Sequence, residues 1–159
     1  MPDAAWHTRH ARILRSSYRH WTGLDLIPAA IDDVQAVNVL DQANFAVVSH
    51  DTQPDPVFNY GNALALRLFE TFWAAFTALP SRLSAEPMIQ SERDSLLARV
   101  SRDGFIDDYT GIRISQQGKR FLIRKATVWN LLDERGQPYG QAALIKDWEP
   151  LPPNAQETR

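Results

Sequence analysis

The 159-residue sequence contains no cysteine, and this absence excludes several kinds of chemistry. Disulfide bonds, thiolate metal sites and a cysteine nucleophile cannot form. Long apolar runs are absent as well. None approaches the roughly 18 residues of a membrane span, and the N-terminus lacks the apolar core of a signal peptide. We therefore expect a cytoplasmic protein with no membrane partner.

The sequence also has no large excess of charge of either sign. The formal net charge is only −2, so the protein has no overall field that would attract nucleic acid, and no nucleic-acid partner is expected. Glycine-rich phosphate-binding loops and the Gly-x-Ser-x-Gly motif of serine hydrolases are absent too. The composition, 44% hydrophobic and 23% charged, is ordinary for a globular domain that buries its own core.

The most aromatic stretch of the chain spans residues 56–76. It begins with residues that suit a strand, and Gly61-Asn62 follows as a turn signal. Apolar residues then recur at steps of three and four, which predicts one helix. Its apolar stripe comprises Leu68, Phe69, Phe72, Trp73 and Phe76. A stripe of this kind more often belongs to a core than to a ligand site.

The first 22 residues predict a basic amphipathic helix that ends at Gly23. Arginines and histidines surround its apolar face, which consists of Trp6, Ile13, Leu14, Tyr18 and Trp21. Two interpretations remain open. The helix packs through its aromatic residues with solvated arginines outside, or it serves as a docking or dimerisation helix.

The other segments predict an α+β fold. A helix capped by Asp32 or Asp33 precedes a strand at residues 45–49, and another helix spans residues 88–101. Three hairpin-linked strands follow. In the long middle strand, apolar residues on odd positions are interrupted only by Lys125, which predicts that Trp129 faces the helices and the aromatic stripe. Helices on one face of an antiparallel sheet are the expected arrangement.

The order of these elements resembles a PAS domain. The strings FNYGNALALRLF and GIRISQQGKRFLIRKATVWNLLDERGQPYGQAALI are similar to the PAS strand–helix signature and to its closing three-strand meander. The blocks SHDTQPDPVFNYGNALALRLFE, LPSRLSAEP, ATVWNL and GQAA further resemble the MEKHLA family of PAS-like domains, in its stand-alone bacterial form. The resemblance covers residues 6–148, although the six-residue string that names the family in plants is absent.

The resemblance implies three regions. Residues 1–44 would form an N-terminal helical extension, residues 45–148 a PAS-like domain with a five-stranded sheet, and residues 149–159 a flexible tail. PAS-like domains hold ligands between the sheet and its helices. The candidate pocket residues are Phe69, Trp73, Phe76, Arg82, Tyr109, Trp129 and Gln141.

No cofactor is identified by the sequence. The flavin photosensors of this fold use a cysteine, and all four histidines lie at or before residue 50, away from the elements that ligate haem. His50, Asp51 and Asp55 form the best cluster for metal or acid–base chemistry, but they are too few for a metal site and fix a turn equally well. We therefore predict neither a metal site nor catalytic residues. Arg82 either orders its own loop, through Glu86, or closes the pocket over an anionic group.

Three functions follow from these observations. The first is a non-catalytic sensory or ligand-binding module for a small, largely apolar molecule, and a pocket below ~100 Å³ would count strongly against it. The second is a protein-interaction or homodimerisation module with a filled core, which uses the N-terminal helix. The third is an enzyme, for which no residue names a reaction.

Overall fold

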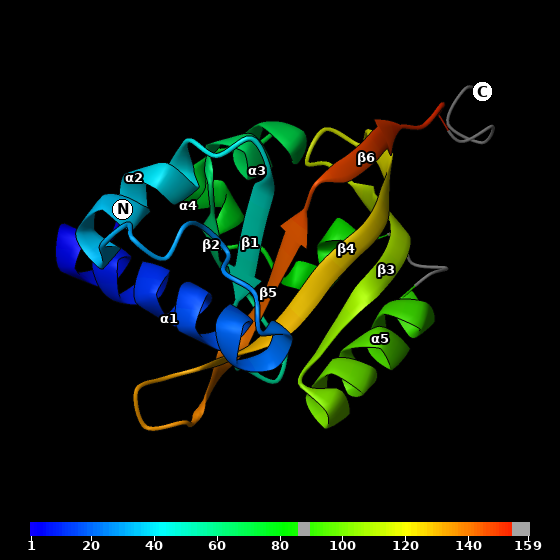
Figure 1. Cartoon of the computed structure of the whole chain (residues 1–159). Helices are drawn as coiled ribbons and strands as arrows, with labels where there is room; N and C mark the ends of the chain where they lie inside the picture. The colour runs from blue at the N-terminus through cyan, green and yellow to red at the C-terminus, as the bar shows by residue number, and fades with distance from the viewer. Residues whose placement is uncertain (86–89, 154–159) are drawn as a thin grey trace.

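The computed structural model describes residues 1–85 and 90–153, which form a sheet of six antiparallel strands with helices on both sides (Figure 1). The strand order is β2-β1-β5-β4-β3, and β6 also pairs with β4. The elements are α1 (Ala4–Thr22), α2 (Asp33–Asp41), β1 (Ala46–His50), β2 (Phe58–Gly61), α3 (Ala63–Leu68), α4 (Trp73–Phe76), the 3₁₀ turn η1 (Ser81–Ser84), α5 (Gln90–Asp103), β3 (Phe105–Ile114), β4 (Arg120–Leu132), β5 (Pro138–Ile145) and β6 (Asp147–Pro150).

This architecture confirms the predicted α+β class with an antiparallel sheet, but β6 adds a sixth strand to the five predicted and the helices cover both faces instead of one. The helices α3, α4 and α5 and the turn η1 cover what we call the inner face of the sheet, while α1 and α2 cover the outer face (Figure 1). The start of the helix predicted at residues 88–101 lies outside the described residues, and α5 continues to Asp103. None of the described helices is long and apolar enough to cross a membrane.

The helix α1 uses its apolar face inside its own chain. The Asp3 carboxylate caps its start by accepting the N–H of Trp6, and Gly23, with a φ of 75°, ends it as predicted. Leu14 is fully buried, and the indole N–H of Trp21 donates to the Asn130 carbonyl at 2.9 Å. The first of the two interpretations of this helix is therefore confirmed.

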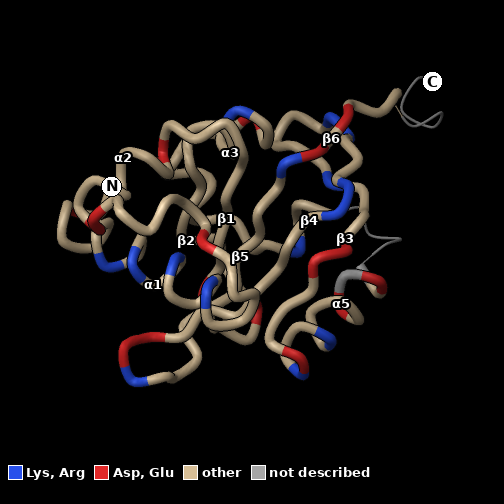
Figure 2. Tube along the Cα trace, in the orientation of Figure 1, with Lys and Arg blue, Asp and Glu red and all other residues tan. Residues whose placement is uncertain are grey.

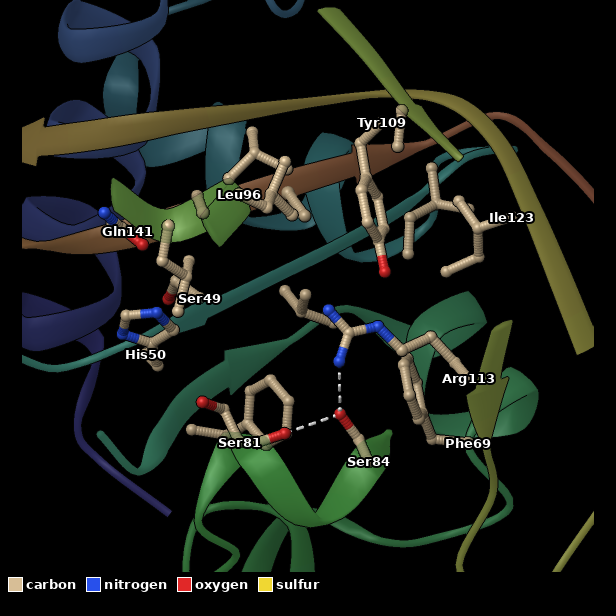
Figure 3. A pocket seen from close by; sticks show the side chains of 18 residues that line it. Ser49, His50, Phe69, Ser81, Ser84, Leu96, Tyr109, Arg113, Ile123 and Gln141 are labelled. Carbon is tan, nitrogen blue, oxygen red and sulfur yellow. Dashed lines mark hydrogen bonds between the residues drawn. The ribbon is translucent and has the colours of Figure 1, made fainter. Parts of the chain in front are cut away.

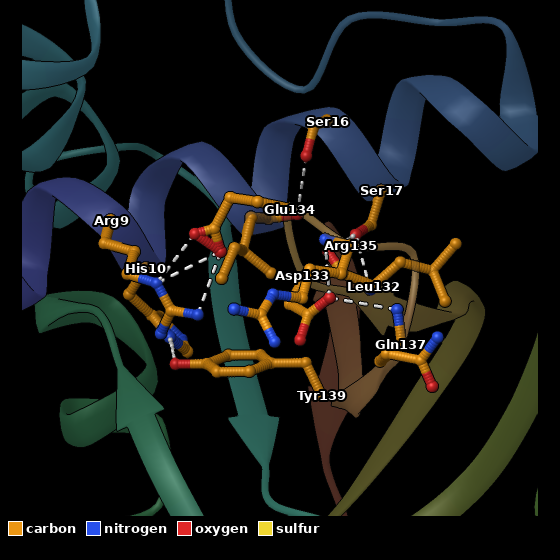
Figure 4. Close-up of polar contacts among 11 residues, drawn as sticks. Arg9, His10, Ser16, Ser17, Leu132, Asp133, Glu134, Arg135, Gln137 and Tyr139 are labelled. Atoms are coloured by element: carbon orange, nitrogen blue, oxygen red, sulfur yellow. Dashed lines mark hydrogen bonds and ion pairs between the residues drawn. The ribbon is translucent and has the colours of Figure 1, made fainter.

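The four arginines of α1 are paired with carboxylates of the same chain, and Figure 2 shows how basic and acidic residues are distributed along the trace. These pairs are Arg9–Glu134 at 2.9 Å, Arg12–Asp33 at 3.2 Å, Arg15–Asp33 at 2.9 Å and Arg19–Asp25 at 2.8 Å. Figure 4 shows the first of them, which joins the middle of α1 to the turn between β4 and β5. Exposed pairs of this kind stabilise little, but they neutralise the positive face of the helix.

The single helix predicted across residues 62–76 is wrong, because the chain breaks at Glu70. This residue adopts the left-handed conformation with a φ of 53°, and the Ser115 hydroxyl donates to its carboxylate at 2.7 Å. Two short helices result, α3 and α4, so the aromatic stripe is not continuous. Phe69 and Phe76 enter the inner core, whereas Phe72 is 67% exposed.

The predicted orientation of Trp129 is also wrong, and the cause is a bulge at Lys125. Lys125 has a φ of 50°, and the pairing of β3 with β4 shifts by one residue between Ala126 and Ile123. Before the bulge, odd-numbered residues such as Ile123 face inward. After it, Ala126 and Val128 face inward, and Trp129 turns to the outer face with Leu131.

On the outer face Trp129 is completely buried against α1. Its ring meets Tyr18 edge-on, with the ring centroids 5.0 Å apart and an interplanar angle of 75°. The outer core of Trp129, Leu131 and Leu14 is built jointly by residues 1–44 and the strands. At the other end of the chain, Glu149 and Pro150 belong to β6 and pair with β4, so the sheet extends two residues beyond residue 148.

Candidate functional site

A small cavity lies between the inner face of the sheet and the segment from α3 to α5 (Figure 3). Its volume is about 60 Å³. The wall is mainly apolar, with Val48, Phe58, Leu96, Ile123 and Val128 among the lining residues. This volume is below the ~100 Å³ limit given above and counts strongly against the first function, so that only a compact ligand is still compatible with it.

Three of the seven predicted pocket residues line this cavity: Phe69, Tyr109 and Gln141. The other four lie elsewhere. Trp129 faces α1, and Phe76 stacks on Phe58 with ring centroids 4.2 Å apart. Trp73 packs edge-on against Trp6 with ring centroids 6.3 Å apart, beside the outer core. Arg82 is exposed, and its Nε donates to the Asp55 carboxylate at 3.1 Å.

Arg113, and not Arg82, is the arginine that lines this cavity. It comes from β3, and Figure 3 shows its guanidinium directed into the cavity. Its Nη1 donates to the Ser84 hydroxyl at 3.2 Å, and that hydroxyl donates to the Ser81 carbonyl at 2.7 Å. The Arg113 guanidinium carbon also lies 5.5 Å from the centre of the Tyr109 ring.

The sequence held a signal for Arg113 that the alternation of Ile112 and Ile114 obscured. The hairpin places Arg113 opposite Phe121, and Phe121 is an inner-core residue. Directly paired residues of an antiparallel sheet share a face, so the arginine must face inward with the phenylalanine.

Gln141 provides a polar group near another part of the wall. Its Nε2 donates to Asn130 Oδ1 at 2.9 Å, and Asn130 Nδ2 donates to the Val100 carbonyl at 2.9 Å. The Gln141 Oε1 atom is buried and accepts no hydrogen bond from the described residues. The hydrogen bond to Asn130 fixes the orientation of the Gln141 amide, so Gln141 Oε1 is a preoriented acceptor at the cavity wall.

The cluster of His50, Asp51 and Asp55 fixes a turn. The Asp51 carboxylate accepts the N–H groups of Gln53 at 3.2 Å and Val57 at 3.0 Å. Partial burial would raise the pKa of Asp51, but these hydrogen bonds hold it below its usual range. Within residues 1–85 and 90–153, no three His, Asp or Glu side chains gather closely enough to hold a metal ion.

A second polar network joins α1 to the outer face. His10 is buried, with Nε2 2.9 Å from the Ser49 hydroxyl and Nδ1 3.3 Å from the Tyr139 hydroxyl, and Figure 4 shows the contact with Tyr139. Its ring stacks on Trp6 with centroids 4.5 Å apart. Burial, together with the nearby charges of His7 and Arg9, lowers the pKa of His10 to about 3, so the imidazole is neutral.

The strand order, the short helices over the inner face and the cavity beneath them define a PAS-type domain. Solved structures agree on this fold. A PAS domain from Colwellia psychrerythraea superimposes with a TM-score of 0.60 at 18% identity, covering 71% of this chain and 93% of that one. The light-state dimer of the fungal blue-light photoreceptor Vivid gives 0.58 at 14% identity, covering 84% and 90%.

Within this class, the chain belongs to the MEKHLA domain family, whose model matches residues 8–150. A similar protein is the homeobox-leucine zipper protein ATHB-9 of Arabidopsis thaliana, which is 26% identical over 145 residues. The match covers 86% of this chain and 17% of ATHB-9. Because the chain spans only this share of the plant protein, the activity of the whole plant protein is not transferred to it.

Proposed function

We propose that the chain is a sensory module that responds to a compact small molecule held in the inner cavity, without catalysing a reaction. The PAS-type fold supports this, since the cavity lies between the sheet and the inner helices, as small-molecule sites commonly lie between packed elements. The family assignment is compatible with it and names no ligand.

The volume of the cavity restricts the ligand. A water-sized position needs about 10–15 Å³, so about 60 Å³ holds roughly four to six non-hydrogen atoms. Flavins, haem and other large cofactors exceed this by several times. The proposal is therefore limited to a compact molecule with a largely apolar body.

The observation that carries the proposal is the unused acceptor of Gln141. A buried polar atom without a partner costs free energy, of the order of 1–3 kcal/mol, unless water or a ligand satisfies it. A bound molecule that donates to Gln141 Oε1, or that holds an ordered water donating both to Gln141 Oε1 and to the molecule itself, would recover this energy.

Filling the cavity tests the proposal. Ala143 pairs with Val48 and Val128 and lines the cavity, so Ala143→Leu directs a larger side chain into it. Ala98→Leu adds the same atoms on the exposed side of α5 and is the matched control. Native mass spectrometry and thermal unfolding with a panel of compact molecules should detect a ligand for the wild type and Ala98→Leu only. Absence of binding to the wild type, with Ala143→Leu more stable, would overturn the proposal.

The second candidate is an interaction module with a filled core, which the small cavity favours. The apolar face of α1 is already used by the outer core, so a dimer would need another surface. Phe72, 67% exposed, and Leu83, 48% exposed, are apolar groups on the inner layer. Sedimentation of the intact chain separates the candidates, because only the second requires self-association or a protein partner.

A further inference from the structure

Arg113 gives the cavity a positive charge that no lining carboxylate balances. Among the described residues of the wall it is the only Lys or Arg, and none of them is Asp or Glu. Several described carboxylates form ion pairs with other cations, and none of the described carboxylates forms one with Arg113. A guanidinium stays charged at any physiological pH, so the cavity carries this charge permanently.

The donors of Arg113 are mostly unused. Its one hydrogen bond to a described residue goes to the Ser84 hydroxyl, which is itself committed to the Ser81 carbonyl. Ser81 and Ser84 are both buried, so this chain of bonds fixes one edge of the guanidinium. The remaining N–H groups keep the planar fork geometry that matches a carboxylate through two parallel hydrogen bonds.

The ring of Tyr109 holds the guanidinium from another side. This position depends on Gly111, because a Cβ placed there would lie 2.5 Å from the tyrosine hydroxyl oxygen. The backbone of β3 also anchors the arginine, since Arg113 bridges Ala85 and pairs with Phe121. Contacts on several sides preorganise the cation, which lowers the entropy lost when an anion binds.

We infer that the ligand of the cavity is a short-chain monocarboxylate of about two to four carbons, with its carboxylate on Arg113. This inference rests on the proposed function. The volume admits roughly four to six non-hydrogen atoms, which is the size range from acetate to butyrate. The hydrocarbon end meets the apolar wall around Val128, Leu96 and Ala143. A strongly hydrated inorganic anion would gain nothing from that wall.

Butyrate and butyramide are the probes for the test, because they have the same number of non-hydrogen atoms and differ in charge. Binding is measured by calorimetry at constant ionic strength on wild type, Arg113→Gln, Arg113→Lys and Arg82→Gln. Arg82→Gln removes an equal charge outside the cavity and is the control. Hexanoate, which has eight non-hydrogen atoms, tests the size limit.

We expect butyrate to bind wild type and Arg82→Gln alike, and to bind Arg113→Gln about a hundredfold more weakly. Arg113→Lys keeps the charge but loses the paired hydrogen bonds, so it should bind about tenfold more weakly. Hexanoate should not bind. If Arg113→Gln does not fold, Arg113→Lys provides the test, and butyrate should bind it about tenfold more weakly than it binds Arg82→Gln.

The outcomes separate this inference from the proposed function. If wild type and Arg113→Gln both bind butyramide with the affinity that wild type has for butyrate, the inference of a carboxylate ligand is overturned. The proposed function would then stand with a compact neutral ligand. Phosphate bound as tightly as butyrate would overturn it in favour of a general anion site. Failure of every compact molecule to bind the wild type would overturn both.

Discussion

The two faces of the sheet are covered in different ways. The outer face is closed by two regular helices, α1 of 19 residues and α2 of 9 residues, and Leu14, Trp129 and Leu131 beneath them are fully buried. The inner face is covered by α5 of 14 residues and by short pieces, with 6 residues in α3 and 4 in α4, and it contains the cavity with Arg113 and Gln141.

This difference separates stability from binding. Close packing gains the full free energy of apolar burial. A change in side-chain volume in such a core lowers the stability of the protein. A face that contains a cavity has fewer packing contacts to lose when a ligand enters. Under the proposed function, the outer face would act as the support and the inner face as the part that responds to a ligand.

The largest expected effect is on the outer face, at Trp129. Trp129→Ala should destabilise the protein by roughly 3–5 kcal/mol, the typical loss for a buried aromatic side chain cut to alanine. Asn130 points to the inner face, where its amide bonds the Val100 carbonyl and Gln141, so Asn130→Ala should cost about 1–2 kcal/mol. Urea unfolding measures both. A larger loss for Asn130→Ala would contradict the claim that the outer face dominates stability.

The next effect concerns Asn62, which joins the two layers. Its Oδ1 accepts the N–H groups of Val47 and Ala65, and its Nδ2 donates to the carbonyls of Leu40 and Phe45. Asn62→Ala removes a helix cap and leaves buried backbone groups unpaired, so we expect a loss of about 3 kcal/mol in urea unfolding.

Two controls sharpen this prediction. Asn62→Asp keeps an accepting oxygen but turns its other oxygen toward the Leu40 and Phe45 carbonyl oxygens at a fully buried position, so it should cost at least as much as Asn62→Ala. Asn38→Ala, at an exposed position of α2, should change stability by less than about 0.5 kcal/mol. Equal losses for Asn62→Ala and Asn38→Ala would show that the layers are not coupled through this amide.

A smaller effect is expected from pH, through His10 on the outer face. The unfolded chain takes up a proton near the ordinary pKa of 6.5, whereas burial delays protonation of the folded chain until about 3. Stability is therefore lost as the pH falls through this window, by about 2 kcal/mol between pH 7 and pH 5. Urea unfolding at several pH values should show this slope in wild type and in His20→Gln, whose histidine is exposed, and lose it in His10→Gln. An unchanged slope in His10→Gln would assign the effect to other groups.

The elements with a clear period or cap could be predicted from the sequence. Asp32 and Gly23 bound their helices as expected, and the meander of β3, β4 and β5 follows from alternation and turn residues. The failures occur at Glu70 and Lys125. Both adopt positive φ for reasons of tertiary packing, which no local propensity records.

Four of the seven predicted pocket residues do not line the cavity, and tertiary contacts are again the reason. Once the bulge at Lys125 is missed, Trp129 is assigned to the pocket instead of Val128. Arg82 was chosen from its loop composition, but its charge is taken by Asp55, which is distant in the sequence. Phe69, Tyr109 and Gln141 line the cavity as the sequence predicts, although Tyr109 lies between two register shifts of β3, where alternation alone does not assign its face.

The bulge has a consequence at the level of the gene. Lys125 is exposed and lacks a fixed role for its side chain, so substitution by residues that tolerate a positive φ, such as glycine or asparagine, should be accepted. Loss of its codon is a different matter. The hydrophobic residues would all remain, but Val128 and Trp129 would exchange layers, along with every residue of β4 that follows. In a library of single-codon deletions, position 125 should therefore be depleted even though it tolerates replacement.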